Sequence, residues 1–139
     1  MTRVYIDIVG DLFHVGHLNL IRTAKALGDY LIVGVHSDLD TAKYKRKPII
    51  EESQRYEIIE SCRYVDEIIE NAPLLITEEF MKEHQIDLVV HGDDIRQAYE
   101  EQHRVPRQLG KMRYVSYTDG ISTSDIINKI KNLGVLNEN

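Results

Sequence analysis

The sequence contains one cysteine, no tryptophan and no long apolar run. Because Cys62 has no second cysteine to pair with, an intramolecular disulfide framework is excluded, which fits a reducing compartment. No apolar stretch approaches the ~20 residues of a membrane-spanning helix. The N-terminus enters an apolar strand pattern by Val4, without the layout of a signal peptide. We therefore expect a cytoplasmic protein with no membrane partner.

An excess of positive charge is missing too, since 17 lysines and arginines stand against 23 aspartates and glutamates, for a net charge of −6. This balance argues against a nucleic-acid partner, which needs a broad basic surface. A compact site for one triphosphate stays compatible with it, because a helix N-terminus and a few local cations suffice. The 139 residues are enough for one domain and too few for two. We expect a single domain over 1–134 and a frayed tail over 135–139.

Two common phosphate-binding signatures are absent as well. The sequence has neither the Gly-Lys-Ser/Thr end of a P-loop nor the Gly-x-Gly-x-x-Gly of dinucleotide-binding proteins. It therefore gives little support to a P-loop NTPase or a Rossmann dehydrogenase.

Strand and helix patterns alternate along the chain. Apolar, β-branched runs predict strands at 4–9, 30–35, 65–69, 88–91 and 113–117. Periodic apolar positions and capping residues predict helices at 16–27, 53–62, 77–84 and from 122 to about 134, with 95–110 partly helical. This alternation predicts an α/β fold with a doubly wound, mainly parallel five-stranded sheet and helices on both faces. Ligands of such sheets bind beyond the carboxyl ends of the strands.

Two histidines follow the first predicted strand, in the tetrapeptide His14-Val15-Gly16-His17. Side chains three apart share a helix face, so both rings can address one ligand. Gly16 permits close approach of a phosphate, and the helix N-terminus attracts anions. Histidines here can neutralise charge on phosphate oxygens during phosphoryl-type transfer. Taken alone, the pair is equally compatible with one capping and one packed histidine. A metal site is not expected, because no third ligand has fixed spacing.

Two further segments suit phosphate binding. Residues 118–124 contain a glycine and four hydroxyl side chains, three of them (Ser122, Thr123 and Ser124) at a predicted helix start, although an ordinary N-cap is the simpler interpretation of that segment alone. Lys43, Lys45, Arg46 and Lys47 form a basic loop, which is either a solvated charge run or a flexible segment that closes over phosphates.

The segment His91-Gly92-Asp93-Asp94 follows a buried predicted strand. A carboxylate there can accept from the amino group of a base or hold Mg²⁺ through water. A plain turn is the alternative.

In combination, residues 11–17 and 120–124 resemble the cytidylyltransferase family of the HxGH nucleotidyltransferase superfamily. The likeness is to enzymes that make CDP-glycerol, CDP-ethanolamine and CDP-choline. It extends from about Val4 to Lys131 and includes 28–35, 63–67 and 71–73.

The resemblance implies that CTP lies across the sheet and that a phosphate oxygen of a small phospho-alcohol attacks its α-phosphorus, which releases pyrophosphate. It implies catalytic roles for His14, His17 and Lys45, with Lys43 or Arg46 as alternatives to Lys45. It also implies Mg²⁺ with the triphosphate and a homodimer with 63–67 near the contact.

The remaining roles are likewise implied by the resemblance. The nucleotide-binding residues would be Val9, Gly10, Gly16, Arg55, Arg63, Gly92, Asp94, Thr118, Gly120, Ile121, Ser122 and Thr123. The acceptor-binding residues would be Asp11, Lys45, Leu74 and Thr77.

The sequence departs from the family at both ends of the site. Ile8 and Gly10 stand where the family has a glycine and an aromatic residue, so the backbone contacts of this loop differ. Tyr117 replaces an arginine, and Arg113 or Lys111 would have to supply the missing cation.

Leu74 stands where choline and ethanolamine enzymes have an aromatic residue. Because quaternary ammonium groups favour aromatic faces, Leu74 argues against phosphocholine and leaves phosphoethanolamine, glycerol 3-phosphate or a less common phospho-alcohol. Two alternatives to cytidylyl transfer are an adenylyltransferase on the same scaffold and a nucleotide-binding module without catalysis. The presence of His14, His17 and Lys45 argues against the second.

Overall fold

One parallel sheet organises the fold. The computed structural model describes residues 1–93, 97–116 and 118–137, and these form five parallel strands in the order β3-β2-β1-β4-β5. The strands are β1 (Arg3–Ile8), β2 (Tyr30–Val35), β3 (Glu67–Glu70), β4 (Leu88–Gly92) and β5 (Met112–Val115). The predicted five-stranded parallel sheet is confirmed.

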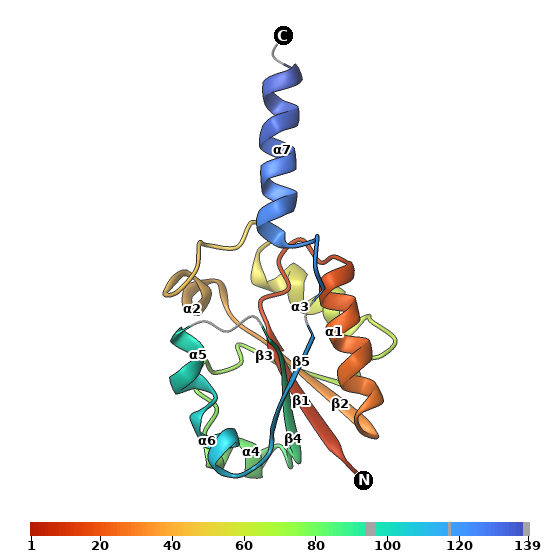
Figure 1. Cartoon of the computed structure of the whole chain (residues 1–139), viewed down its shortest axis with the longest axis vertical. Helices are drawn as coiled ribbons and strands as arrows, with labels where there is room; N and C mark the ends of the chain where they lie inside the picture. Colours follow the sequence, from red (N-terminus) through yellow and green to blue (C-terminus); the bar gives the residue numbers. More distant parts are fainter. Residues whose placement is uncertain (94–96, 117, 138–139) are drawn as a thin grey trace.

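Helices cover both faces of this sheet (Figure 1). They are α1 (Val15–Ala26), α2 (Asp38–Ala42), α3 (Glu52–Glu60), α4 (Glu78–Glu83), α5 (Gln97–Gln102), α6 (Arg104–Gln108) and α7 (Thr123–Asn137). Ile6 of β1 belongs to one core with Ile21 of α1 and Ile59 of α3, while Tyr5 belongs to a second core with Met81 of α4. Because side chains alternate along a strand, a strand covered on both faces needs an unbroken apolar run.

The chain changes its direction of travel across the sheet beside β1. The strands β1, β2 and β3 run outward to one edge, and β4 returns to the other side of β1. The loops after β1 and β4 therefore separate and leave a crevice between them. Gly10 begins the loop after β1 with a φ of +71°, and a Cβ there would lie 2.6 Å from Cδ1 of Ile59. Both constraints favour glycine at this position.

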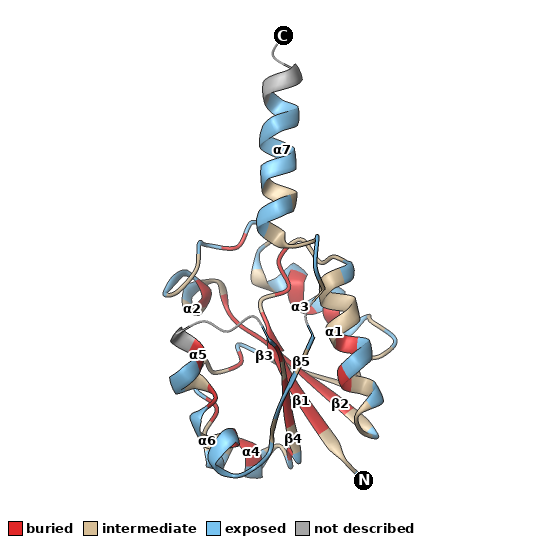
Figure 2. Cartoon of the chain, in the orientation of Figure 1, coloured by how far each residue is buried: buried red, intermediate tan, exposed pale blue. Residues whose placement is uncertain are grey.

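Two helices differ from the sequence expectation. The sequence does not predict α2, whose first turn is capped by Ser37 through a hydrogen bond from the Asp40 amide. The last helix was expected to end near Leu133 and Gly134 but continues to Asn137. Gly134 does not adopt the positive φ with which glycine commonly ends a helix. The predicted helix end is therefore wrong, and α7 projects from the body with most of its described residues exposed (Figures 1 and 2).

None of the helices in the described part of the chain is both long and apolar enough to cross a membrane.

Candidate functional site

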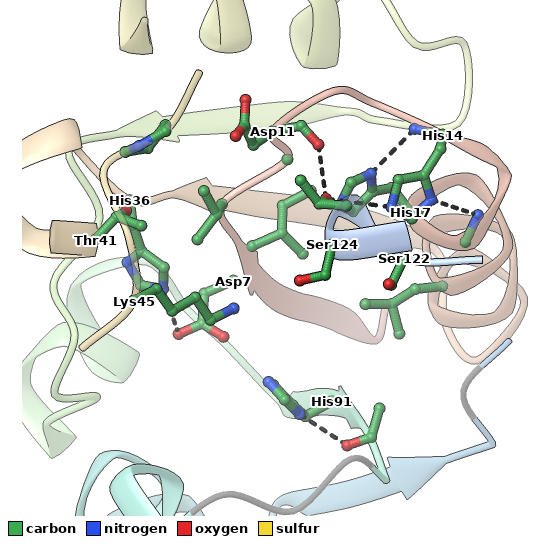
Figure 3. Close-up of a pocket in the computed structure, with 18 of the residues that line it drawn as sticks. Asp7, Asp11, His14, His17, His36, Thr41, Lys45, His91, Ser122 and Ser124 are labelled. Carbon is green, nitrogen blue, oxygen red and sulfur yellow. Dashed lines mark hydrogen bonds and ion pairs between the residues drawn. The ribbon is translucent and has the colours of Figure 1, made fainter. Parts of the chain in front are cut away.

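A cavity of about 380 Å³ opens at the carboxyl ends of β1 and β4 (Figure 3). Its walls come from the β1–α1 loop, the basic loop, β4, α5 and the segment that leads into α7. Twelve of the predicted site residues line it: Val9, Gly10, Asp11, His14, Gly16, His17, Lys45, Gly92, Thr118, Ile121, Ser122 and Thr123. Three segments far apart in the sequence thus meet where the doubly wound fold predicts a ligand.

His14 and His17 cap the first turn of α1 reciprocally. Nδ1 of His14 accepts a hydrogen bond from the Gly16 amide at 3.0 Å, and Nδ1 of His17 accepts one from the His14 amide at 3.1 Å. A Cβ on Gly16 would lie 2.9 Å from Nδ1 of His14, so glycine allows this close approach. Because an amide only donates, each neutral ring carries its proton on Nε2. Capping and ligand binding are therefore compatible for both rings.

The environment keeps these two imidazoles neutral. Burial lowers the pKa of His14. Burial, and then the charges of His14 and Lys45, lower the pKa of His17 to about 3. The two rings are stacked, with centroids 3.9 Å apart. Near neutral pH each ring therefore offers an Nε2–H donor rather than a full positive charge.

Thr123 links His14 to the start of α7. Its hydroxyl donates to the carbonyl oxygen of Asp11 at 3.0 Å, so its oxygen is left to accept from Nε2 of His14, which lies 3.4 Å away. Ser122 has the opposite arrangement, because its oxygen accepts from the Asp125 amide at 3.1 Å as the predicted N-cap. The proton of the Ser122 hydroxyl remains available to a ligand oxygen.

The basic loop presents two of its four cations to the cavity. Lys45 and Arg46 line it, and Arg46 Nη2 donates to Ser124 Oγ at 3.2 Å. Lys43 instead pairs with Asp40 on the surface at 3.0 Å. Neither Lys111 nor Arg113 lines the cavity; among the described lysines and arginines, Lys45 and Arg46 do. Tyr117 itself lies outside the described residues.

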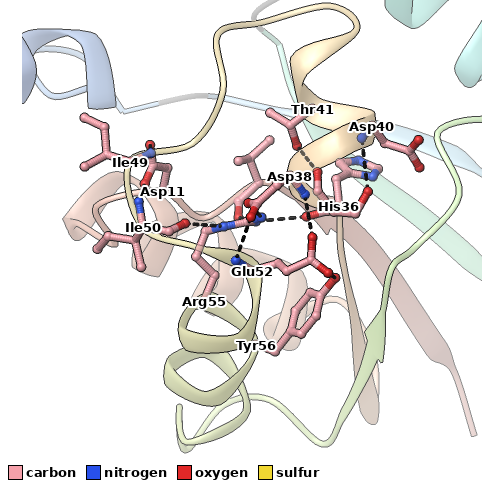
Figure 4. Close-up of polar contacts among 12 residues, drawn as sticks. Asp11, His36, Asp38, Asp40, Thr41, Ile49, Ile50, Glu52, Arg55 and Tyr56 are labelled. Atoms are coloured by element: carbon pink, nitrogen blue, oxygen red, sulfur yellow. Dashed lines mark hydrogen bonds and ion pairs between the residues drawn. The ribbon is translucent and has the colours of Figure 1, made fainter.

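Arg55 and Asp11 hold loops together beneath the cavity (Figure 4). Arg55 is 1% exposed, pairs with Asp38 at 2.7 Å, and donates to the carbonyl oxygens of Val9 and His36. It does not line the cavity, contrary to its expected place beside the nucleotide. Asp11 does line it, yet its two carboxylate oxygens accept from the amides of Ile49 and Ile50 at 2.9 Å each.

Four other predicted residues lie away from the cavity: Arg63, Leu74, Thr77 and Gly120. Arg63 hydrogen-bonds Tyr64 on the surface, and its part in a dimer contact stays a prediction. Thr77 caps α4 by accepting from the Phe80 amide at 3.1 Å, which accounts for its hydroxyl. Gly120 forms a turn with a φ of +80°. Asp94 lies outside the described residues.

Sequence reasoning missed a buried polar pair in the cavity wall. Asp7 of β1 and His36, which follows β2, form an ion pair with 3.5 Å between Oδ2 and Nε2. Burial by itself would lower the pKa of His36, but its contact with the Asp7 carboxylate and the charge of that group outweigh burial and raise that pKa. Burial would raise the pKa of Asp7, yet the facing histidines lower it. The available signal was an aspartate inside an otherwise apolar strand.

Comparison with known proteins agrees with this geometry. Residues 11–129 match the family described as cytidylyltransferase-like. Over 138 residues the chain is 42% identical to the probable ethanolamine-phosphate cytidylyltransferase of Encephalitozoon cuniculi (96% of this chain, 43% of that protein). Over 134 residues it is 44% identical to choline-phosphate cytidylyltransferase A of Homo sapiens (93% and 36%). The chain thus spans less than half the length of these curated relatives.

Solved structures share the fold. The lipopolysaccharide core biosynthesis protein from Thermoplasma volcanium GSS1 matches with a TM-score of 0.71 and 28% identity, covering 86% of this chain and 99% of that one. A pantoate-beta-alanine ligase from Francisella tularensis matches with a TM-score of 0.56 at 15% identity, covering 99% and 72%, which bears on the fold alone. Residues 11–129 match the family model, and His14 and His17 cap the helix that follows β1 at the carboxyl edge of the sheet. The chain therefore belongs to the cytidylyltransferase-like family.

Proposed function

We propose that the chain transfers the cytidylyl group of CTP to a small phospho-alcohol and releases pyrophosphate. The observation that carries this proposal is the pair of neutral, stacked imidazoles of His14 and His17, fixed through Nδ1 with their Nε2–H groups at the cavity, where that of His14 also reaches the Thr123 oxygen. Family membership supports the reaction type.

The chemistry needs hydrogen-bond donors and positive charge rather than a strong base. A phosphate oxygen of the acceptor attacks the α-phosphorus of CTP, and the bond from that phosphorus to the oxygen bridging to the β-phosphate breaks. Pyrophosphate leaves with the bonding electrons. Charge builds on the oxygens around the phosphorus, and the Nε2–H groups of His14 and His17 are placed to donate to them.

Lys45 and Arg46 supply the positive charge. Their loop is anchored at its end by Asp11, which binds the amides of Ile49 and Ile50, and beside α7 by the contact of Arg46 with Ser124. Lys45 lies close enough to His17 to lower the pKa of that ring, so its ammonium group and the imidazole act on the same region. The two negatively charged phosphate groups that meet in the reaction would repel each other less beside such a cation.

Magnesium is proposed to enter with CTP as part of the substrate. The carboxylates among the described residues that line the cavity are Asp7 and Asp11. Both oxygens of Asp11 are engaged by backbone amides, and Asp7 lies beside the imidazole of His36 rather than beside further oxygen ligands. Mg²⁺ is commonly held by substrate phosphates and water, so this lining suits an ion carried by the triphosphate.

Phosphoethanolamine is the first acceptor to test, because relatives from Encephalitozoon cuniculi and Dictyostelium discoideum are named ethanolamine-phosphate cytidylyltransferases. Leu74 does not line the cavity, so it gives no reason to exclude phosphocholine. Ring faces at the cavity come instead from Tyr44, His91 and Tyr99.

The reaction is tested directly with a substrate panel. The protein with Mg²⁺ is incubated with each of the four nucleoside triphosphates and with phosphoethanolamine, phosphocholine or glycerol 3-phosphate, and pyrophosphate is measured. We expect release with CTP and a phospho-alcohol together and none with CTP alone. Release with ATP in place of CTP would contradict cytidylyl transfer, and no release with any pair would favour a binding module.

Two substitutions at His17 separate its two nitrogens. In His17→Asn the amide oxygen replaces Nδ1 and keeps the cap on the His14 amide, but the Nε2 donor is lost. In His17→Gln the side-chain amide nitrogen reaches the Nε2 position. We expect kcat to fall more than tenfold in the asparagine variant and less in the glutamine variant, although the glutamine variant loses the cap and should unfold at the lower temperature. Equal activity of the asparagine variant and wild type would rule out the donor role.

Lys45 and Lys43 form a matched pair on one loop. Lys45→Ala removes the ammonium at the cavity, whereas Lys43→Ala makes the same charge change on the surface beside Asp40. We expect kcat/KM to fall by about 10²–10³ for Lys45→Ala and to stay near wild type for Lys43→Ala. Comparable losses in both variants would indicate a general effect of loop charge rather than a contact with the reacting phosphates.

A further inference from the structure

Three metal-ligand side chains converge at the base of the cavity. They are Asp7 of β1, His91 of β4 and His103, which lies between α5 and α6. One oxygen or nitrogen atom from each lies within 4.8 Å of the others. Asp7 is 6% exposed and His103 is fully buried, while His91 is half-buried. Figure 3 shows Asp7 and His91 at the cavity, and both line it.

The hydrogen bonds around His91 prepare its ring for coordination. Its Nδ1 lies 2.8 Å from the carbonyl oxygen of Gly92. Because a carbonyl only accepts, Nδ1 carries the proton and Nε2 keeps its lone pair. Metal-binding histidines characteristically donate the other ring N–H to a carbonyl or carboxylate in this way. For His103, the Tyr114 hydroxyl lies 3.4 Å from Nδ1 and holds that side of the ring.

Asp7 brings the negative charge that a cation would neutralise. Within the described residues, its buried Oδ2 has no hydrogen-bond partner and faces His36 at the 3.5 Å of the ion pair. His36 offsets the charge of this oxygen without a close hydrogen bond, which leaves the lone pairs of the carboxylate for a metal ion. His36 is itself held by the carbonyl oxygen of Ala72 at 3.1 Å, so it can orient the carboxylate from outside the cluster.

We propose that Asp7, His91 and His103 bind one divalent transition-metal ion, with Zn²⁺ as the reference ion. Two imidazoles and one carboxylate are a typical ligand set for Zn²⁺, whereas Mg²⁺ and Ca²⁺ favour oxygen ligands alone. Tetrahedral Zn²⁺ with bonds of ~2.1 Å separates its ligand atoms by ~3.4 Å. The three ligand atoms lie within 4.8 Å of one another, so small side-chain rotations would bring them to that spacing.

Three protein ligands leave one coordination position open. Because Asp7 and His91 line the cavity while His103 is buried behind them, the open position faces the space where substrates bind. The ion would present a positive centre to a lone pair or anionic group of a ligand there. It is separate from the Mg²⁺ proposed to enter with CTP, and it does not depend on which nucleotide is used.

The site is tested by metal binding without nucleotide. The chain is stripped with a chelator, and Co²⁺ is added as a spectroscopic probe, followed by displacement with Zn²⁺. We expect one ion per chain, with the visible absorption of tetrahedral Co²⁺, and loss of that absorption when Zn²⁺ is added. Absence of a stoichiometric Co²⁺ spectrum would overturn the proposal without any variant.

Variants locate the ion. We expect affinity for Co²⁺ and Zn²⁺ to fall at least ~10-fold in His91→Gln and in His103→Gln. His84 packs on Phe80 outside the cluster, so His84→Gln is the control and should bind both ions like wild type. His91 is half-buried, so its variant tests the site even if loss of the buried His103 ring prevents folding. Loss of the spectrum in His17→Asn, with binding intact in His91→Gln, would place the ion at other histidines and contradict the proposal.

Discussion

Two imidazole rings cap the first turn of α1, where a hydroxyl or carboxylate is more usual, and the site depends on this exchange of hydrogen bonds. Each Nδ1 accepts from a backbone amide, which fixes the orientation of the ring and leaves the proton on Nε2. Gly16 leaves room for the His14 ring, and the hydroxyl of Thr123, at the start of α7, contacts Nε2 of that ring. A local helix cap thus also orients the Nε2–H groups of two imidazoles that line the cavity.

The loops around these rings are held by Arg55 and Asp11, whose charged groups are engaged by other groups of the protein. Arg55 joins the segments after β1 and β2 through carbonyl oxygens and Asp38, while Asp11 anchors the end of the basic loop. A buried guanidinium with carbonyl and carboxylate partners is a strong structural tie, because its loss leaves several acceptors unsatisfied. Arg55, expected beside the nucleotide, and Asp11, expected at the acceptor, thus both fix the backbone that surrounds the cavity.

The sequence predicted the parallel sheet, the edge that carries the cavity, and the placement of His14, His17 and Lys45 at it. Apolar runs and short motifs depend on neighbouring residues, so they can be recognised without the structure. The sequence did not predict the partners of Arg55, nor that Leu74 and Thr77 lie away from the cavity. A motif specifies residue types but not the atoms that they contact. The convergence of Asp7, His91 and His103 depends on pairing of β1 with β4 and on the placement of α5, which are long-range contacts. The predicted end of α7 was wrong because a glycine that ends a helix commonly adopts a positive φ, and Gly134 does not.

The central claim is that His17 is a neutral donor with its proton on Nε2. Nitrogen-15 NMR of the histidine side chains, recorded on the unliganded protein from pH 7.5 to pH 5, measures tautomer and charge separately for each ring. A His17 pKa of about 3 predicts that this ring keeps the Nε2–H tautomer throughout the range. Titration of His17 near the ordinary value of about 6.5, or a proton on Nδ1 at neutral pH, would contradict the account.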